Sequence, residues 1–487
     1  MWLLAGAAMV AALPAAAAAK KAAADDPRIG VLEQELRDVK SELAEIKHTQ
    51  TDQAASQDNS AALIDLKRST SAQYVDVNNR FDALTRADVA NGRVTFVSPD
   101  SRFSFALRTL VQFDAAYFGQ GRNPASVDLN SGTNFRRAQV GFTGTAWRDF
   151  SYNLTLDFAG NGVEKSGYIY TAFIEYDGFK PFGFRVGAFA PPAGLDDSTG
   201  SADLLFLERA SGSDIARNIA GSPSREGASI FAQGDNYLVS VAYTTKKAGD
   251  AATFDEQSAV VGRAAWLAYS DSDLKWELDA DLTHVFKLPD AVANGATSAT
   301  NNLASFSNGP EVGVDSTKTV NTGNIDASTI TEFGFETGLA WREFYGQGGY
   351  YHYSIERRAS ALPDPDFDGW YALLTWSITG ESHAYDPVTA SFRGLRPAHP
   401  LGDGGFGAFE LKARYSNIDL NYLPFTATTA GGVPGGEQNV WTLGANWYPT
   451  QGIRFALDYD NVHVSHPNAV GNNISTDVIA LRSQLSL

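Results

Sequence analysis

The stretch Asp477-Val-Ile-Ala-Leu-Arg-Ser-Gln-Leu-Ser-Leu487 alternates between apolar and polar side chains. In an extended strand one face carries Ile479, Leu481, Leu485 and Leu487, and the other carries Ala480, Arg482, Gln484 and Ser486. In a soluble protein, such a strand at the end of a chain would be an aggregation-prone edge. In a transmembrane barrel it is the closing seam, which pairs with the first strand. The pattern therefore favours a strand that crosses a membrane.

The same period of two recurs from about residue 101 onward. Apolar and aromatic residues occupy one face in the segments 103–117, 154–158, 237–243, 276–282, 333–341, 370–378, 409–415 and 453–459. The other face repeatedly carries charge, as at Asp157, Glu175, Arg185, Glu277, Asp279, Asp281, Glu332, Glu336, Glu410, Lys412, Arg414, Arg454, Asp458 and Asp460. Strands of about ten residues with aromatic ends have the length needed to cross a bilayer obliquely. We expect the apolar face to contact lipid and the charged face to enclose water.

The length of the chain sets the size of this barrel. About 387 residues follow residue 100, and sixteen strands would use about 24 residues each with their connections. The sequence thus predicts an all-β transmembrane barrel of about 16 antiparallel strands. Polar, glycine-rich connections near 119–134, 191–226, 288–328, 381–408 and 424–438 are expected on the outer face or folded into the pore.

Composition excludes several function classes. A net charge of -18 and a pI near 4.8 argue against a nucleic-acid partner. The absence of cysteine excludes disulfides, thiolate metal sites and thiol nucleophiles. The seven histidines show no metal-ligand spacing beyond His463 and His466, and no nucleophile–base motif is visible. We therefore expect no cofactor, no metal and no enzymatic activity.

The first 92 residues follow a different pattern. Residues 1–19 are uncharged and end in small residues, which predicts a secretory signal peptide. In residues 20–92, a heptad pattern typical of a coiled coil links Ile29, Leu32, Leu36, Val39, Leu43 and Ile46. Leucine at a with β-branched residues at d favours trimers or tetramers, although the helix could instead lie on its own domain. We place the barrel domain at residues 93–487.

Specific segments resemble a known family. The stretch Asn134-Phe-Arg-Arg-Ala-Gln-Val-Gly-Phe-Thr-Gly-Thr-Ala-Trp-Arg-Asp-Phe150 is similar to a segment of the phosphate-selective porin O and P family. Ordered matches follow at Asp157-Phe158, Asp177–Pro181, Leu207–Ala210, Tyr371–Glu381, Phe409–Tyr415 and Thr442–Tyr448. The resemblance covers roughly residues 95–487. It implies a sixteen-stranded outer-membrane homotrimer with a short N-terminal coiled coil in the periplasm.

The resemblance also implies the site residues. The paired arginines that line the pore of phosphate-specific members fall on Arg136 and Arg137, and strand alternation turns Arg137 toward the lumen. Further pore-lining candidates are Arg108, on the polar face of the first strand, and Arg185, Arg209, Arg393 and Arg396. The inward-folded constriction loop carries Asp196 and Asp197, where Asp197 replaces a family lysine. Other family cations fall on Ser151 and Leu110, which predicts a weaker filter than strong phosphate selectivity requires.

The sequence is consistent with two functions. The first is a passive channel for small hydrophilic solutes with a mild preference for anions such as phosphate. The alternative is a structural protein that tethers the outer membrane to peptidoglycan or another partner through the coiled coil, with permeation secondary. Arg137 itself has two interpretations, as a selectivity residue or as an arginine that stiffens the barrel by pairing with a lumen carboxylate.

Overall fold

The computed structural model describes residues 27–52, 60–82, 85–90, 93–120, 127–160, 163–250, 255–290, 302–358, 361–423, 430–466 and 473–487. The predicted signal peptide, residues 1–19, lies outside these ranges. Two compact units are present, of which one contains the helices α2 and α3 and the other contains a β-barrel. No helix among the described residues is both long and apolar enough to span a membrane.

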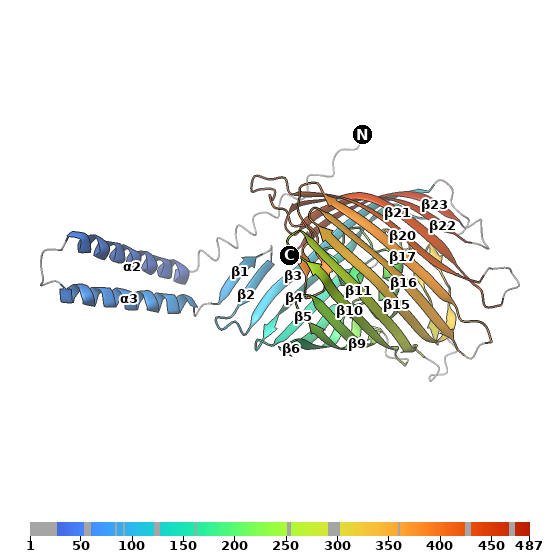
Figure 1. Ribbon diagram of the computed structural model, residues 1–487, viewed down its shortest axis with the longest axis horizontal. Helices are drawn as coiled ribbons and strands as arrows, with labels where there is room; N and C mark the ends of the chain where they lie inside the picture. Colours follow the sequence, from blue (N-terminus) through green and yellow to red (C-terminus); the bar gives the residue numbers. More distant parts are fainter. Residues whose placement is uncertain are drawn as a thin grey trace. The chain divides into compact units, whose positions relative to one another are not determined.

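Sixteen antiparallel strands form the closed barrel, as predicted (Figure 1). The first eight are β3 (Ser104–Gln120), β4 (Gly132–Ala146), β5 (Phe150–Gly160), β6 (Val163–Phe179), β7 (Phe182–Phe189), β8 (Arg225–Gln233), β9 (Tyr237–Lys247) and β10 (Ser258–Ser270). The others are β11 (Leu274–Lys287), β15 (Ile325–Trp341), β16 (Phe344–Arg357), β17 (Asp366–Ser377), β20 (Ala408–Tyr422), β21 (Val433–Thr450), β22 (Ile453–Ser465) and β23 (Ile474–Ser486). The last strand closes the ring against the first, with Leu481 opposite Ala115.

The two faces of the strands are inverted relative to a soluble protein. The apolar face is exposed to the surroundings, as at Leu481 (51%) and Phe335 (55%). The charged face points inward and is buried, as at Asp279 (1%) and Arg454 (2%). Apolar side chains outside and charged side chains inside are the arrangement that a membrane-embedded barrel requires. The alternation read from the sequence is therefore confirmed.

The connections differ between the two ends of the barrel. At one end most are tight turns, such as residues 451–452 between β21 and β22. The other end has the long connections, including 190–224 and 288–324. One long connection, 378–407 between β17 and β20, lies at the end with the tight turns. Because 190–224 and 378–407 leave from opposite ends and are hydrogen-bonded to each other, for example from Ser391 Oγ to Ser198 O (3.3 Å), both fold into the lumen.

Short elements occur within these connections. Residues 190–224 contain α4 (Leu195–Ser198) and α5 (Ser211–Ala220). Residues 288–324 contain β12 (Leu303–Ala304), β13 (Ser307–Asn308) and β14 (Val320–Asn321), and 378–407 contains β18 (Tyr385–Asp386) and β19 (Ser391–Phe392). Helix α5 contacts β10, β11, β16, β17 and β20, which places it inside the ring.

The N-terminal unit contains a pair of helices, α2 (Pro27–Asp52) and α3 (Ser60–Asp82), which lie side by side (Figure 1). The short strands β1 (Arg86–Ala90) and β2 (Arg93–Val97) follow in sequence. The d positions Leu32, Val39 and Ile46 of the predicted seam are buried, and Arg80 of α3 pairs with Glu35 of α2 at 3.0 Å.

The a positions of this seam are less covered within the chain. Leu36 is half-buried and Leu43 is 39% exposed, whereas the side chain of Ile29 lies outside the described part. The helix is thus present where the heptads predict it, with one side facing a second helix of the same chain. Pairing between chains stays a prediction.

Candidate pore constriction

The inward segment 190–224 is held to the barrel wall by cations that bind its backbone. Lys412 Nζ donates to Leu205 O at 2.6 Å, Arg414 Nη1 donates to Glu208 O at 2.7 Å, and Arg454 donates to Leu204 O. In return, Leu207 N donates to Asp458 Oδ2 at 3.1 Å. These cations satisfy buried carbonyl groups that no helix or strand pairs, so they hold the constriction rather than line it.

The second inward segment is fixed by a buried histidine. His383 Nε2 lies 2.7 Å from Glu410 Oε1, and its Nδ1 lies 2.7 Å from Arg393 O. Both partners are acceptors, so both ring nitrogens must donate, as only the imidazolium can. Burial alone would lower the pKa of His383, but the carboxylate of Glu410 outweighs it and raises the pKa above its ordinary value.

A β-bulge in β4 explains why two consecutive arginines can both point inward. In the β3–β4 register Gln112 faces Arg137, but the next residue, Phe113, faces Phe135. Arg136 is therefore an extra residue in its strand, and the bulge breaks the alternation there. Arg137 is 6% exposed, and Arg136 reaches a carboxylate of the constriction loop. Simple alternation places only Arg137 in the lumen, so the bulge is the feature that the sequence does not reveal.

Arg136 and Arg482 both contact Glu208, and Arg482 also binds Asp114. Arg136 binds Glu208 through Nε (2.5 Å) and Nη2 (2.8 Å), and Arg482 binds both oxygens of Asp114 at 2.7 and 2.6 Å. Arg482 also lies 3.3 Å from Glu208. Burial opposes ionisation of Glu208, but Arg136 outweighs it and keeps the pKa of that carboxyl below its ordinary range. We call Arg136, Arg137, Arg482, Glu208 and Asp114 the basic cluster.

Arg137 is the member of this cluster without an acidic partner among the described residues. Its Nη1 donates to the neutral amide oxygen of Gln112 at 2.6 Å. Gln112 is itself fixed, because its Nε2 donates to Gln484 Oε1 at 2.6 Å and to Ser201 O at 3.0 Å. Arg108 lies four residues before Gln112 on β3. It is exposed and forms no ion pair with another described residue. Arg137 thus forms no ion pair with a described carboxylate, and its role in selectivity or in stiffening the barrel stays a prediction.

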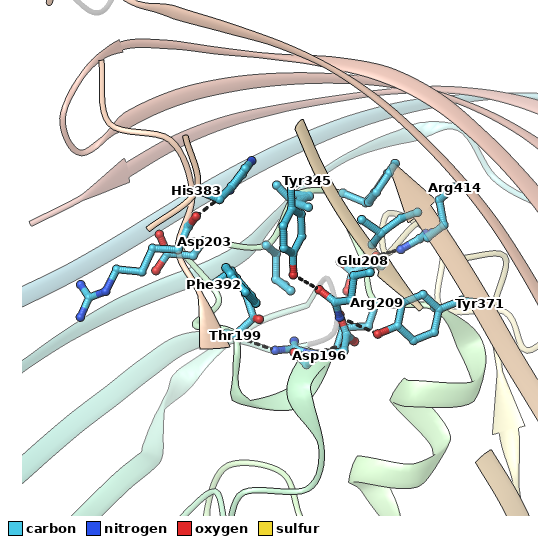
Figure 2. Close-up of a pocket in the computed structure, with 17 residues that line it drawn as sticks. Asp196, Thr199, Asp203, Glu208, Arg209, Tyr345, Tyr371, His383, Phe392 and Arg414 are labelled. Carbon is cyan, nitrogen blue, oxygen red and sulfur yellow. Dashed lines mark hydrogen bonds and ion pairs between the residues drawn. The ribbon is translucent and has the colours of Figure 1, made fainter. Parts of the chain in front are cut away.

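A cavity of about 530 Å³ adjoins the basic cluster. Its charged lining groups include the cations Arg136, Arg209, Arg217, Arg225 and Lys318 and the carboxylates Glu208, Asp214, Glu311 and Asp315. A second space is much smaller, at about 20 Å³. Its lining residues include Asp196 and Arg209 (Figure 2). In that view Arg209 lies beside Asp196, with Tyr371 and Arg414 close by.

The other predicted pore residues have local partners. Arg209 donates to the carbonyl groups of Asp196, Asp197 and Thr199, so it supports the loop at α4. The carboxylate of Asp196 accepts from Ser213 Oγ at 2.5 Å, and that of Asp197 accepts from Arg217 Nε. Both acids are therefore engaged within the constriction loop rather than presented to a permeating ion.

Arg185, Arg393 and Arg396 lie apart from the basic cluster. Arg185 binds Glu175 Oε2 at 2.7 Å across the β6–β7 pair and stacks on Phe173 at 4.6 Å. Arg393 binds Asp386 at 2.6 Å within the second inward segment, and Arg396 is exposed in the same segment. Strand alternation finds Arg185 but cannot indicate its partner.

Several lumen cations were not candidates from the sequence. Arg482 and Arg414 lie on the charged faces of β23 and β20, so alternation alone identifies them as inward. Arg217 lies in α5, where no strand pattern points to the lumen, and Arg225 is the first residue of β8. Only the folded position of the loop reveals Arg217.

The model of the family "Phosphate-selective porin O and P" matches residues 106–487. This chain belongs to that porin family. The porin chain is 26% identical over 392 residues to Porin O of Pseudomonas aeruginosa, covering 76% of this chain and 85% of that protein.

Similar folds have also been solved. OmpT of Vibrio cholerae is 11% identical with a TM-score of 0.49, covering 79% of this chain and 98% of its own. An anion-selective porin from Comamonas acidovorans is 12% identical with a TM-score of 0.46, covering 79% and 100%. Family membership and the barrel identify an outer-membrane porin, and they indicate a channel rather than an enzyme.

Proposed function

We propose that this porin passes small hydrophilic solutes passively and mildly prefers small anions, phosphate among them, because of Arg137. The observation that carries the proposal is the contact of its guanidinium with a neutral amide and with no carboxylate of the described residues. Arg108 supports it as a second lumen cation of the same strand pair without an ion-pair partner there.

Local charge supports the same preference. The basic cluster has three guanidinium groups, on Arg136, Arg137 and Arg482, and two carboxylates, on Glu208 and Asp114. One positive charge is therefore in excess within the cluster, next to Arg136, which lines the cavity. An ion in a pore responds to the field at the constriction, so the net charge of -18 for the chain does not decide selectivity. Guanidinium groups suit oxyanions because they can donate two parallel hydrogen bonds.

The test compares two lumen arginines in planar bilayers. We expect Arg137→Ala to lower the anion-to-cation permeability ratio, measured as a shift of the reversal potential in a KCl gradient and repeated with potassium phosphate. Arg185→Ala is the matched control, since Arg185 is neutralised by Glu175. An unchanged reversal potential in Arg137→Ala, or an equal shift in both variants, would assign Arg137 a structural role.

We also propose a homotrimer whose N-terminal helices lie in the periplasm. Short turns mark the periplasmic end of outer-membrane barrels, and β3 begins at that end, so the preceding chain leaves the barrel there. The exposed a position Leu43 leaves part of the heptad seam available to other chains. Light scattering of the detergent-solubilised full chain is expected to give three chains per particle, and a monomer would contradict the proposal.

A further inference from the structure

A second cluster of charge lies half-way round the ring from the basic cluster, on β10, β11 and β15. Its five carboxylates are Glu277, Asp279, Asp281, Glu332 and Glu336, and each is between 0% and 5% exposed. Strand pairing assembles them, because Asp279 faces Glu336 and Asp281 faces Gly334 in the β11–β15 register. Glu332 lies diagonally beside Asp281 on the same inward face. We call these five residues the acidic cluster.

The acidic cluster has fewer cations than its five carboxylates need to neutralise their charge. Among the described residues, Arg263 of β10 is the one guanidinium that binds it, to Asp279 Oδ2 at 2.6 Å and to Glu277 Oε1 at 3.5 Å. Elsewhere in the lumen several buried acids have their own cations, as in Asp114 with Arg482 or Glu311 with Arg414. Several buried carboxylates that share a single cation are unfavourable unless protons or another positive charge neutralise them.

Several oxygen atoms of the acidic cluster have no partner. Both carboxylate oxygens of Asp281 and Oδ1 of Asp279 are buried and accept no hydrogen bond from a described residue. Buried polar atoms of a folded protein are normally hydrogen-bonded, so a group of unpartnered acceptors in one place points to a missing positive ligand. The side chain of Asp281 is therefore more than nine-tenths buried and points toward Asp279 and Glu336. No described residue donates a hydrogen bond to its carboxylate.

The oxygens are also close enough to share one ion. Asp279, Asp281 and Glu336 each offer an oxygen, and these three atoms lie within 4.8 Å of one another. Glycines leave the room for them. A Cβ on Gly334 would lie 2.3 Å from Asp281 Oδ1, and one on Gly194 would lie 2.3 Å from Glu336 Oε2. Glu336 is further fixed by the hydroxyl groups of Tyr351 and Tyr371, each 2.6 Å from its Oε1.

We propose that Asp279, Asp281 and Glu336 bind one hard divalent cation of the Ca²⁺ type inside the barrel wall. An all-oxygen set of carboxylates suits Ca²⁺ rather than softer metals. The site lies against the start of α4, where Asp196 N donates to Glu336 at 3.2 Å and Gly194 adjoins Glu336 and Asp281. The bound cation thereby fastens the constriction loop to the wall opposite the basic cluster. This inference does not depend on the anion preference.

Ca²⁺ binding to the full chain tests the proposal. The protein is refolded in non-ionic detergent without lipopolysaccharide, stripped with chelator and titrated with CaCl₂ in 0.1 M KCl by calorimetry. We expect one Ca²⁺ per chain, a higher unfolding temperature with Ca²⁺, and Tb³⁺ luminescence excited through the nearby tyrosines.

The variants locate the site. Asp281→Asn and Glu336→Gln are expected to weaken Ca²⁺ binding at least about ten-fold. Asp460→Asn is the matched control, because Asp460 is an equally buried lumen acid on β22 that lies outside the cluster. The proposal is overturned if wild type binds no Ca²⁺ at millimolar concentration, which would mean that the carboxylates share protons. It is also overturned if Asp281→Asn binds as wild type does. The wild-type titration decides even if a variant fails to fold.

Discussion

The basic and acidic clusters lie on opposite walls of one barrel and leave charge uncompensated in different surroundings. In the basic cluster the buried carboxylates are paired, and the surplus is the guanidinium of Arg137, whose neighbour Arg136 lines a cavity of about 530 Å³. In the acidic cluster the surplus is carboxylate oxygen, which is covered by the start of α4. An uncompensated charge close to the cavity can act on a passing ion. An uncompensated charge that is covered by protein must instead be neutralised where it lies. We therefore propose a selectivity element on one wall of the barrel and an anchoring element on the other.

The largest expected effect comes from removing the single cation of the acidic cluster. Arg263→Met would leave its carboxylates without a guanidinium, and breaking a buried ion pair costs about 3–5 kcal/mol. We expect a loss at the upper end of this range in the free energy of unfolding, measured by denaturant titration in detergent without Ca²⁺. Arg482→Met in the basic cluster should lose less, because Arg136 lies near the bared Asp114. Equal losses would show that the two walls do not differ in charge balance.

A smaller effect is expected at His383, where one cation meets one carboxylate. Because the folded state raises the pKa of His383, its pairing with Glu410 stabilises the fold fully below the unfolded pKa near 6.5. That stabilisation is lost as the pH rises through the folded pKa. His383→Gln should therefore lower stability by about 1.5–3 kcal/mol at acidic pH and by less at alkaline pH. Unfolding temperatures of both proteins across pH check this, and a difference that grows with pH would refute it.

Ion pairs on the protein surface provide a reference for the two losses of stability expected at Arg263 and His383. Arg342 and Asp273 are 2.8 Å apart but 60% and 49% exposed, and such surface pairs contribute about 0–1 kcal/mol. Arg342→Ala should thus change the free energy of unfolding by less than any lumen variant above. A loss as large as that of Arg263→Met would undermine the argument from burial.

The barrel itself could be read from the sequence, because lipid outside and polar groups inside impose a period of two on every strand. Ile479 and Leu481 are exposed and Arg482 is buried, as the alternation at 477–487 predicts. The period also identified Asp279 and Asp281 as neighbours on one face, but as residues lining a wet lumen. The structure corrects this, since both are buried beside Glu336 and below α4.

The constriction could be predicted only in part. A bulge at Arg136 changes which side chains point inward, and no composition marks it. The partners of Asp197 and Arg209 depend on how residues 190–224 fold back, which local patterns do not encode. Likewise, the heptads of α2 indicate a helix with an apolar seam but not that α3 would cover the d positions.

We propose that this porin conducts ions and that its constriction favours anions. The most direct test is a reversal-potential measurement on the wild-type chain in a planar bilayer with a KCl gradient. We predict discrete conductance steps and a reversal potential displaced toward the chloride equilibrium potential. A membrane without steps, or a reversal potential displaced toward potassium, would contradict the account.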